Sequence, residues 1–300
     1  MKISGISVDF GGTKIASCRV VENSIVQRLE VATDGTASAD EQLSTIVNLV
    51  EQMEPRREDA IGVAVAGRVD SSGTWHAVNT TTLTQIQSVP LKDILSAKFH
   101  RPVNIQNDAI AAAMGEHICG AGQAIDRFGF ITVSTGVGGG IVLNGRPVIS
   151  PDGIAGHIGF STSRRSSDRC GSGRVGTVEA FAAGRAIATR AEQLGYVGYD
   201  ARMVFEAHLR GDGWATDLIT SSASAIAELC ANLKAILGLD RIAIGGSIGL
   251  AAGYREQIEG TLATEPVPFR PQIVSATLGK DGALIGVLSD VYQFGASRAH

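Results

Sequence analysis

The chain has 300 residues, of which 44% are hydrophobic and 19% are charged, so it can bury a sizeable core and is not disordered as a whole. At roughly 150 residues per domain, this length predicts about two lobes. Thirty acidic residues against 26 basic ones give a net charge of -4, which argues against a nucleic-acid partner. The four cysteines form no C-x-x-C pair, and no run approaches the roughly 18 apolar residues of a membrane span. We therefore expect a cytoplasmic protein with no membrane partner.

The first part of the chain alternates short apolar runs with helical patterns. Residues 3–8 and 13–21 predict a hairpin with Asp9 near its tip. Residues 38–41 supply a capping box for the helix that follows. Further strands are predicted at 27–31, 61–66 and 103–106. The last two are each followed by a loop and a helical stretch, which is typical of parallel core strands, so this order indicates an α/β lobe.

A similar order begins again after a helix predicted at 109–116. Residues 128–134 predict a strand, 135–139 a glycine turn and 140–143 a second strand. Asn144-Gly145 then gives a type I′ hairpin signal. Beyond a polar stretch the remaining predicted elements are helices at 178–193 and 215–237, strands at 241–244 and 272–275, and a turn at 245–247. Both halves therefore open with a strand, a glycine turn and a strand.

The two glycine turns are candidates for holding a triphosphate. Glycines between two strands leave backbone N–H groups that can face an anion, a threonine adds a hydroxyl donor, and Asp9 can hold a magnesium ion through water. One such turn alone is equally an ordinary hairpin, but a second one in the other half favours phosphate binding. The candidate residues are Asp9, Gly11, Gly12, Thr13, Lys14, Thr135, Gly136 and Gly138.

Asn107-Asp108 lies where the strand 103–106 ends and a helix begins, a position at which open α/β sheets commonly place functional groups. The Asp108 carboxylate could accept a proton from a substrate hydroxyl as that hydroxyl attacks phosphorus, while the Asn107 amide fixes a neighbouring hydroxyl. Asp108 as a helix N-cap is the alternative, and the two roles are compatible.

Together these motifs resemble the ROK family of sugar kinases and repressors, in the actin-like ATPase superfamily. The D-x-G-G-T-K turn matches 9–14, the T-G-x-G-G-G turn matches 135–140, and the N-D-A-x-A-A-A-x-G-E signature matches 107–116. The resemblance implies that Asp108 is the catalytic base, with ATP and Mg²⁺ as cofactors. It also implies that Gly245 and Gly246 lie near the adenosine, and that the sugar contacts Gly67, Asn79, Asn107, His157 and Glu179.

The resemblance further implies an α/β, two-lobed actin-like ATPase (ribonuclease H-like) fold with a cleft between the lobes. We expect an N-terminal lobe at 1–117, on which a C-terminal helix at about 284–300 packs, and a larger lobe at 118–283. It also implies a homodimer formed through the helical second lobe.

Two departures from the family pattern concern the sugar and zinc. His157 replaces the usual glutamate of a G-E-x-G-H segment, which is similar to bacterial N-acetylmannosamine kinases rather than glucokinases. A neutral imidazole offers one donor and one acceptor, so the swap changes which sugar groups can be paired, although a lone histidine is equally a satisfied core residue.

The family's four zinc ligands correspond to Phe160, Cys170, Ser172 and Thr177. A single thiolate cannot complete a structural zinc site, so we predict no zinc.

We therefore expect an ATP-dependent kinase for the 6-hydroxyl of N-acetylmannosamine, acting in sialic acid or amino-sugar catabolism. Glucose, N-acetylglucosamine or fructose is the alternative substrate. A sugar-binding protein without turnover is the non-enzyme alternative, disfavoured because both phosphate turns and Asp108 are present. A repressor of the same family would carry a DNA-binding segment ahead of the first turn, where only eight residues precede Asp9.

Overall fold

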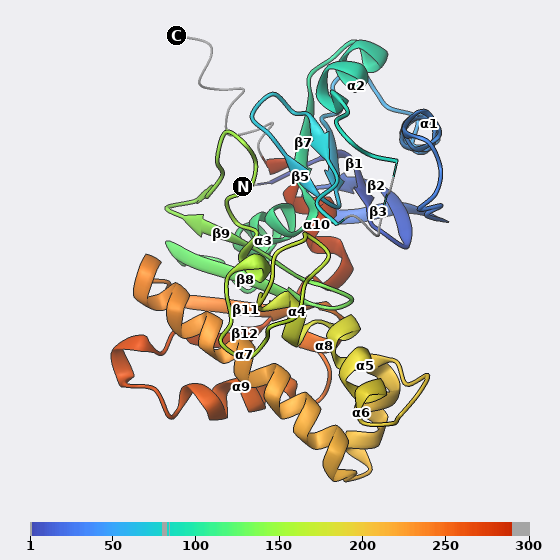
Figure 1. Ribbon diagram of the computed structural model, residues 1–300. Coiled ribbons are helices and arrows are strands. Elements are labelled where there is room, and N and C mark those ends of the chain that lie inside the picture. Colours follow the sequence, from blue (N-terminus) through green and yellow to red (C-terminus); the bar gives the residue numbers. More distant parts are fainter. Residues whose placement is uncertain (1, 80–82, 84, 290–300) are drawn as a thin grey trace. The chain divides into compact units, whose positions relative to one another are not determined.

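Figure 1 shows the computed structural model, which describes residues 2–79, 83 and 85–289. The chain divides into two units, and each is described by itself. Unit 1 comprises 1–123, 146–156 and 280–300, and unit 2 comprises 124–145 and 157–279. The division expected from the sequence stays a prediction. The expected helix at 284–300 lies outside the described residues from position 290 onward.

Unit 1 is built on a five-stranded sheet in the order β3-β2-β1-β4-β7. The strands are β1 (Gly5–Phe10), β2 (Lys14–Val21), β3 (Ser24–Ala32), β4 (Ile61–Val65) and β7 (Val103–Asn107). The predicted hairpin forms, because β1 pairs antiparallel with β2, whereas β1, β4 and β7 are parallel. A small hairpin of β5 (Arg68–Val69) and β6 (Trp75–His76) follows β4.

Helices cover both faces of this sheet, which explains why β4 is apolar along its whole length. The helices are α1 (Ala39–Glu51), α2 (Leu91–Phe99), α3 (Asp108–Cys119) and α10 (Gly282–Gly286). The short strand β10 (Arg146–Pro147) lies in the segment 146–156 and is not one of the five strands of this sheet. Ile61 and Val63 of β4 share a core with α1 and α2, while Gly62 between them faces Val287, next to α10. The predicted capping box at the start of α1 forms, with the side chains of Ser38 and Glu41 bonding each other's backbone N–H.

Unit 2 repeats the plan with a sheet in which β9, β8, β11 and β12 are neighbours in that order. The strands are β8 (Arg127–Val133), β9 (Val137–Leu143), β11 (Arg241–Gly245) and β12 (Gln272–Ser275). β8 and β9 form an antiparallel hairpin, and β8, β11 and β12 are parallel. Asn144 and Gly145 have φ values of 52° and 75°, as the predicted type I′ turn requires.

Helices make up most of the remainder of unit 2. They are α4 (Glu179–Ala182), α5 (Gly184–Gln193), α6 (Ala201–Leu209), α7 (Gly213–Leu237), α8 (Gly246–Gly249) and α9 (Tyr254–Leu262), with 3₁₀ turns η1 (Ile158–Phe160) and η2 (Val267–Phe269). A third 3₁₀ turn, η3 (Gly279–Asp281), precedes α10. Among the described residues, no helix is long and apolar enough to cross a membrane.

Two sequence expectations for unit 2 were wrong in detail. The helix expected at 178–193 breaks at Ala183, whose ψ is 156°, because the Gly184 N–H donates to the Ser134 carbonyl (2.8 Å) instead of continuing the helix. The glycine turn expected at 135–139 is shorter, because β9 already begins at Val137. Gly138, Gly139 and Gly140 therefore pair with β8 rather than forming a loop.

Candidate active site

The carboxyl ends of three parallel strands bring the candidate residues of unit 1 together. Phe10 of β1 stands opposite Val65 of β4, and Val65 stands opposite Asn107 of β7. The side chains just before and after these positions therefore share one edge of the sheet. Asp9, Asn107 and Asp108 lie at this edge. Sequence spacing alone predicted each residue at a strand end, and the strand order β1-β4-β7 makes them neighbours.

Asn107 caps helix α3 and at the same time holds the Asp108 carboxylate. Its Oδ1 accepts the Ile110 N–H (3.0 Å), which fixes the orientation of the amide. Its Nδ2 donates to Oδ1 of Asp108 (2.8 Å) and to the carbonyl of Gly67 (2.7 Å). The alternative of Asp108 as the N-cap was therefore wrong, because Asn107 fills that position. Asp108 opens the helix instead.

Burial raises the pKa of Asp108 to about 6, although hydrogen bonds from the Ala109 N–H (2.8 Å) and from Asn107 favour the ionised form. A carboxyl with a pKa of about 6 is mostly ionised at neutral pH, yet it is a stronger base than an ordinary aspartate. This combination suits a group that accepts a proton from a hydroxyl.

Asp9 is the second carboxyl at this edge. Burial, and then the negative charge of Asp108, raise its pKa to about 7. A divalent cation would stabilise the ionised forms of these two neighbouring carboxyls. Magnesium suits them because it uses one or two protein carboxylates and takes its other ligands from water and phosphate. The described part of the chain holds no cluster of three or more potential metal ligands. A magnesium site that takes most of its ligands from water and phosphate does not need such a cluster.

The first glycine turn is held together by hydrogen bonds that link Gly11 to Lys14 and Thr33. The Gly11 N–H donates to the Lys14 carbonyl (3.0 Å), and the Gly11 carbonyl accepts the Thr33 hydroxyl (2.8 Å). The Gly11 amide is therefore used within the turn. The Lys14 ammonium pairs with Glu30 at 3.4 Å on an exposed face. Gly12 and Thr13 form the tip of this turn, between β1 and β2.

Gly67 and Asn79 flank the small β5–β6 hairpin. Gly67 has a φ of +114°, and a Cβ there would collide with the backbone carbonyl of His76. Only glycine therefore lets the hairpin pack against this peptide while the Gly67 carbonyl still bonds Asn107. Asn79 follows β6 and is half-buried. Gly67 is thus directly linked to Asn107, the residue beside the candidate base.

In unit 2 the second glycine turn meets Glu179. Oε2 of Glu179 accepts the Val137 N–H (3.1 Å), and a Cβ on Gly136 would stand 2.7 Å from the same oxygen. Burial raises the pKa of Glu179. Thr135 and Gly136 form the turn itself, whereas Gly138 lies inside β9.

The second turn also lies beside the end of β11. The Ser134 and Ser247 hydroxyls are 3.1 Å apart. Gly245 ends β11 and Gly246 begins α8 with a φ of +84°. A Cβ on Gly246 would stand 2.7 Å from the Thr132 hydroxyl oxygen of β8, so the glycine permits close approach of the two strand ends. Unit 2 thus gathers Thr135, Gly136, Gly245 and Gly246 at the carboxyl ends of adjacent parallel strands.

His157 precedes η1, and its imidazole stacks on the ring of Phe160, with centroids 5.7 Å apart and planes within 6°. Phe160 occupies the position where the family pattern has a zinc-binding histidine. Of the other corresponding positions, Thr177 is fully buried, and the Cys170 thiol lies 2.9 Å from the Ser172 hydroxyl. The absence of zinc stays a prediction.

The loop at 161–177 has protein contacts of its own. It folds back as a hairpin through the bridges Thr162–Thr177 and Arg169–Val175. Arg164 and Arg165 both reach Glu228 of α7, at 3.0 and 2.7 Å. Arg164 keeps 83% of its side chain exposed, whereas Arg165 keeps 32%.

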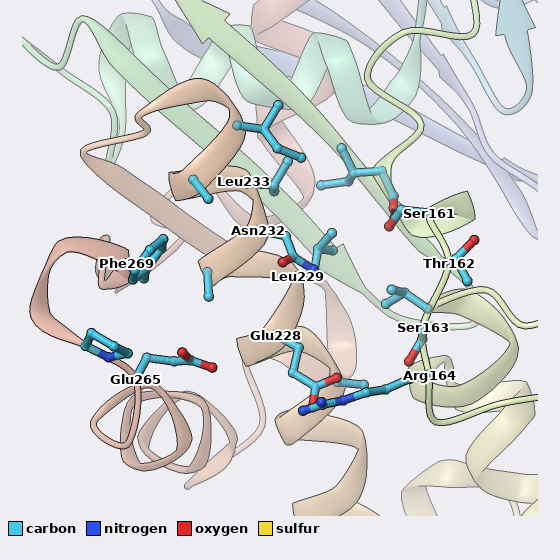
Figure 2. A pocket seen from close by; sticks show the side chains of 17 residues that line it. Ser161, Thr162, Ser163, Arg164, Glu228, Leu229, Asn232, Leu233, Glu265 and Phe269 are labelled. Atoms are coloured by element: carbon cyan, nitrogen blue, oxygen red, sulfur yellow. Dashed lines mark hydrogen bonds and ion pairs between the residues drawn. The ribbon is translucent and has the colours of Figure 1, made fainter.

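Two features were missed from the sequence. Trp75 is fully buried, and its indole N–H donates to the Ala66 carbonyl (2.8 Å), next to Gly67. Its only signal was a lone aromatic residue, which is usually a core residue. The second feature is a pocket of about 770 Å³ in unit 2, between α7, the segment 161–164 and η2 (Figure 2). None of the predicted site residues lines it, and its walls look like ordinary helix-face residues in the sequence.

The two α/β units, each opened by a hairpin and continued by parallel strands, define a protein of the actin-like ATPase fold. The model of the ROK family matches residues 5–293. An N-acetylmannosamine kinase of Pasteurella multocida is 38% identical over 281 residues, covering 94% of each chain. The chain belongs to the ROK family.

Solved structures agree with this assignment. A ROK hexokinase from Thermus thermophilus superimposes with a TM-score of 0.86 at 29% identity, covering 98% of this chain and 100% of that one. A ROK glucokinase from Streptomyces griseus, in complex with glucose and AMPPNP, superimposes with a TM-score of 0.78 at 29% identity, covering 95% and 98%.

Proposed function

We propose that the protein is an ATP-dependent sugar kinase that phosphorylates the 6-hydroxyl of N-acetylmannosamine, in sialic acid or amino-sugar catabolism. The observation that carries the kinase assignment is the Asp108 carboxylate, which is held by Asn107 at a strand edge beside Asp9. The near full-length identity of 38% to an N-acetylmannosamine kinase supports the choice of sugar, as does His157 at the position of the family's usual glutamate.

In this reaction the 6-oxygen of the sugar attacks the γ-phosphorus, ADP leaves, and the hydroxyl proton passes to Asp108. Asn107 holds the carboxylate so that one oxygen accepts hydrogen bonds from the protein. The other oxygen is available to the sugar hydroxyl. Because phosphoryl transfer has a loose transition state, this positioning supplies most of what the protein contributes, together with electrostatic stabilisation.

The nucleotide phosphates are assigned to the two glycine turns, with Gly12, Thr13, Thr135 and Gly136 presenting backbone and hydroxyl donors. Gly245 and Gly246 are assigned to the adenosine. Asp9 would hold a magnesium ion, which neutralises phosphate charge when bound. Gly67, Asn79, Asn107, His157 and Glu179 are assigned to the sugar.

The test is Asp108→Asn, which keeps the shape and the hydrogen bond to the Ala109 N–H but removes the base. We expect turnover to fall by about two to four orders of magnitude while the sugar dissociation constant changes little. Asp217→Asn, on the exposed face of α7, is the matched control and should keep full activity. Near-normal turnover of Asp108→Asn would refute the role of Asp108.

A panel of sugars distinguishes the alternatives. ADP release is measured with N-acetylmannosamine, N-acetylglucosamine, glucose and fructose at equal concentrations. A preference for glucose would mean that His157 does not select the N-acetylated sugar. Sugar binding by calorimetry with no ADP release from any member of the panel would instead favour a binding protein without turnover.

We also propose a cytoplasmic homodimer formed through the helical part of unit 2. ATP as a co-substrate and four free thiols fit a reducing compartment. Ile236 and Val267, which are 75% and 73% exposed, offer apolar surface on α7 and η2, and Ile236 lines the pocket of Figure 2. Light scattering should give about twice the chain mass of 31.2 kDa, and Ile236→Glu should shift it toward the monomer.

A further inference from the structure

We propose that Trp75 is a positioning residue for phosphoryl transfer: its indole N–H fixes the Ala66 carbonyl, next to Gly67, whose own carbonyl holds Asn107 and thereby aims the Asp108 carboxylate. This inference rests on the proposed kinase function. It concerns a residue that touches neither the sugar nor the nucleotide in that proposal. All of its steps lie within unit 1.

The first step is Ala66, the residue that follows β4. Its N–H donates to the Phe10 carbonyl (2.9 Å), which ties Ala66 to the end of β1, next to Asp9. The Ala66 carbonyl accepts the Trp75 indole N–H (2.8 Å). Ala66 is therefore bonded on both sides. Its N–H bonds Phe10 of the first glycine-turn motif, and its carbonyl bonds Trp75.

The second step leads from Ala66 to the base. The Gly67 carbonyl, one residue further, accepts one hydrogen of the Asn107 side-chain amide (2.7 Å). The other hydrogen of that amide goes to Asp108 (2.8 Å). Because both hydrogens of one planar amide are used, a rotation of the Gly67 carbonyl changes the direction in which Asn107 holds Asp108.

The third step is the rigidity of Trp75. Its side chain is 0% exposed, and its ring meets the edge of the Phe10 ring at a centroid distance of 5.1 Å and an angle of 68°. Its backbone N–H and carbonyl both pair with Val89 (2.7 and 2.9 Å). The backbone of Trp75 is thus held by Val89, and its ring is held by Phe10 of the first glycine-turn motif. Its indole donor cannot turn to another partner without repacking the core.

If Trp75 were only a core residue, it would contribute packing and its indole N–H would not matter. The decisive variant therefore removes only this N–H donor. Trp75→Phe keeps an aromatic ring against Phe10 and deletes the N–H. We expect kcat to fall by about tenfold or more, because a small misplacement of a base is costly, while the KM for the sugar rises by less than about threefold. The matched control is Leu95→Val, which trims a buried side chain of the same core without touching this network.

Both variants are compared with the parent at a temperature at which circular dichroism shows each to be folded. If Trp75→Phe does not fold, 3-benzothienylalanine replaces Trp75 in a Trp214→Phe background, since it keeps the ring shape and exchanges the N–H for sulfur. Full kcat in a folded donor-less variant overturns the proposal. So does a loss confined to KM, or an equal loss of kcat in Leu95→Val.

The parent enzyme separates this proposal from the proposed function. If the parent releases no ADP with any sugar of the panel, the kinase assignment has failed. If the parent turns over and the donor-less variant matches it, only the positioning role of Trp75 has failed.

Discussion

Asp9 and Asp108 lie at the same edge of the unit 1 sheet, and the charge of Asp108 helps to raise the pKa of Asp9 to about 7. Two carboxyls that resist joint ionisation store unfavourable electrostatic energy at neutral pH. The burial that makes Asp108 a stronger base therefore also makes the charges of Asp108 and Asp9 costly to the fold.

The pH dependence of stability follows from these raised pKa values. A carboxyl whose pKa is higher in the folded state than its unfolded value near 4 contributes stability that is complete below about pH 4. This contribution is lost as the pH rises through about 6 for Asp108 and about 7 for Asp9. Asp108→Asn removes one charge and relieves Asp9. It should stabilise the protein at pH 8 by about 1 to 3 kcal/mol, after allowance for solvent screening.

Thermal melting without nucleotide or divalent cation checks this at pH 4 and pH 8. The melting temperature of Asp108→Asn should exceed that of the parent by a few degrees at pH 8, and the difference should vanish near pH 4. Asp217→Asn should change neither value. An equal stabilisation at both pH values would show that the Asp108 charge is not its source.

The stacking of His157 on Phe160 gives a prediction for sugar affinity. Aromatic pairs contribute about 0.5 to 1.5 kcal/mol beyond their burial, so losing the Phe160 ring should free the imidazole to leave its orientation. Phe160→Ala should raise the KM for N-acetylmannosamine by up to about tenfold and leave kcat within about twofold. Phe160→Tyr keeps the ring and serves as the control. A KM unchanged in Phe160→Ala would mean that His157 is held by other contacts or does not meet the sugar.

Metal removal gives a third prediction. The thiol of Cys170 already contacts the Ser172 hydroxyl, and Phe160 and Thr177 offer no zinc ligand. Incubation with a chelator should therefore leave the melting temperature unchanged when no nucleotide is present. Metal analysis by mass spectrometry should find zinc far below one equivalent per chain. One equivalent of tightly held zinc, or a melting temperature that drops on chelation, would show that another ligand set exists.

The sequence predicted most of what local chemistry determines. The β1–β2 hairpin, the Ser38–Glu41 capping box and the Asn144-Gly145 turn formed as expected, because turn residues and caps act within a few positions. The parallel strands β4 and β7 were also predicted, since buried strands read as apolar runs.

What the sequence could not show depends on contacts between distant residues. The helical pattern at 178–193 continues without interruption in the letters, yet Gly184 bonds Ser134, which precedes it by 50 residues. Trp75 looks like any buried aromatic residue until the Ala66 carbonyl is placed against its indole. The segment 146–156 belongs to unit 1 because Pro151 bonds Ser71 (2.9 Å), a contact that spacing does not reveal.

Gly139 shows the same lesson and gives the fourth prediction. A run of three glycines suggests a turn, but Gly139 lies in β9 opposite Ile131 of β8. A Cβ there would stand 2.6 Å from the Phe130 carbonyl and would collide with the Ile158 side chain, next to His157. Overpacking of this kind costs about 1 to 3 kcal/mol, so Gly139→Ala should lower the free energy of unfolding by that amount.

Gly260→Ala is the matched control, because Gly260 lies in helix α9 with open space around its Cβ position. Alanine there should leave stability unchanged or raise it by up to about 1 kcal/mol, since alanine favours the helix. Urea unfolding of both variants measures the difference. Equal stabilities would mean that β9 shifts to admit the methyl group. In that case the close approach of Gly139 to Ile158 would not be what keeps glycine at this position.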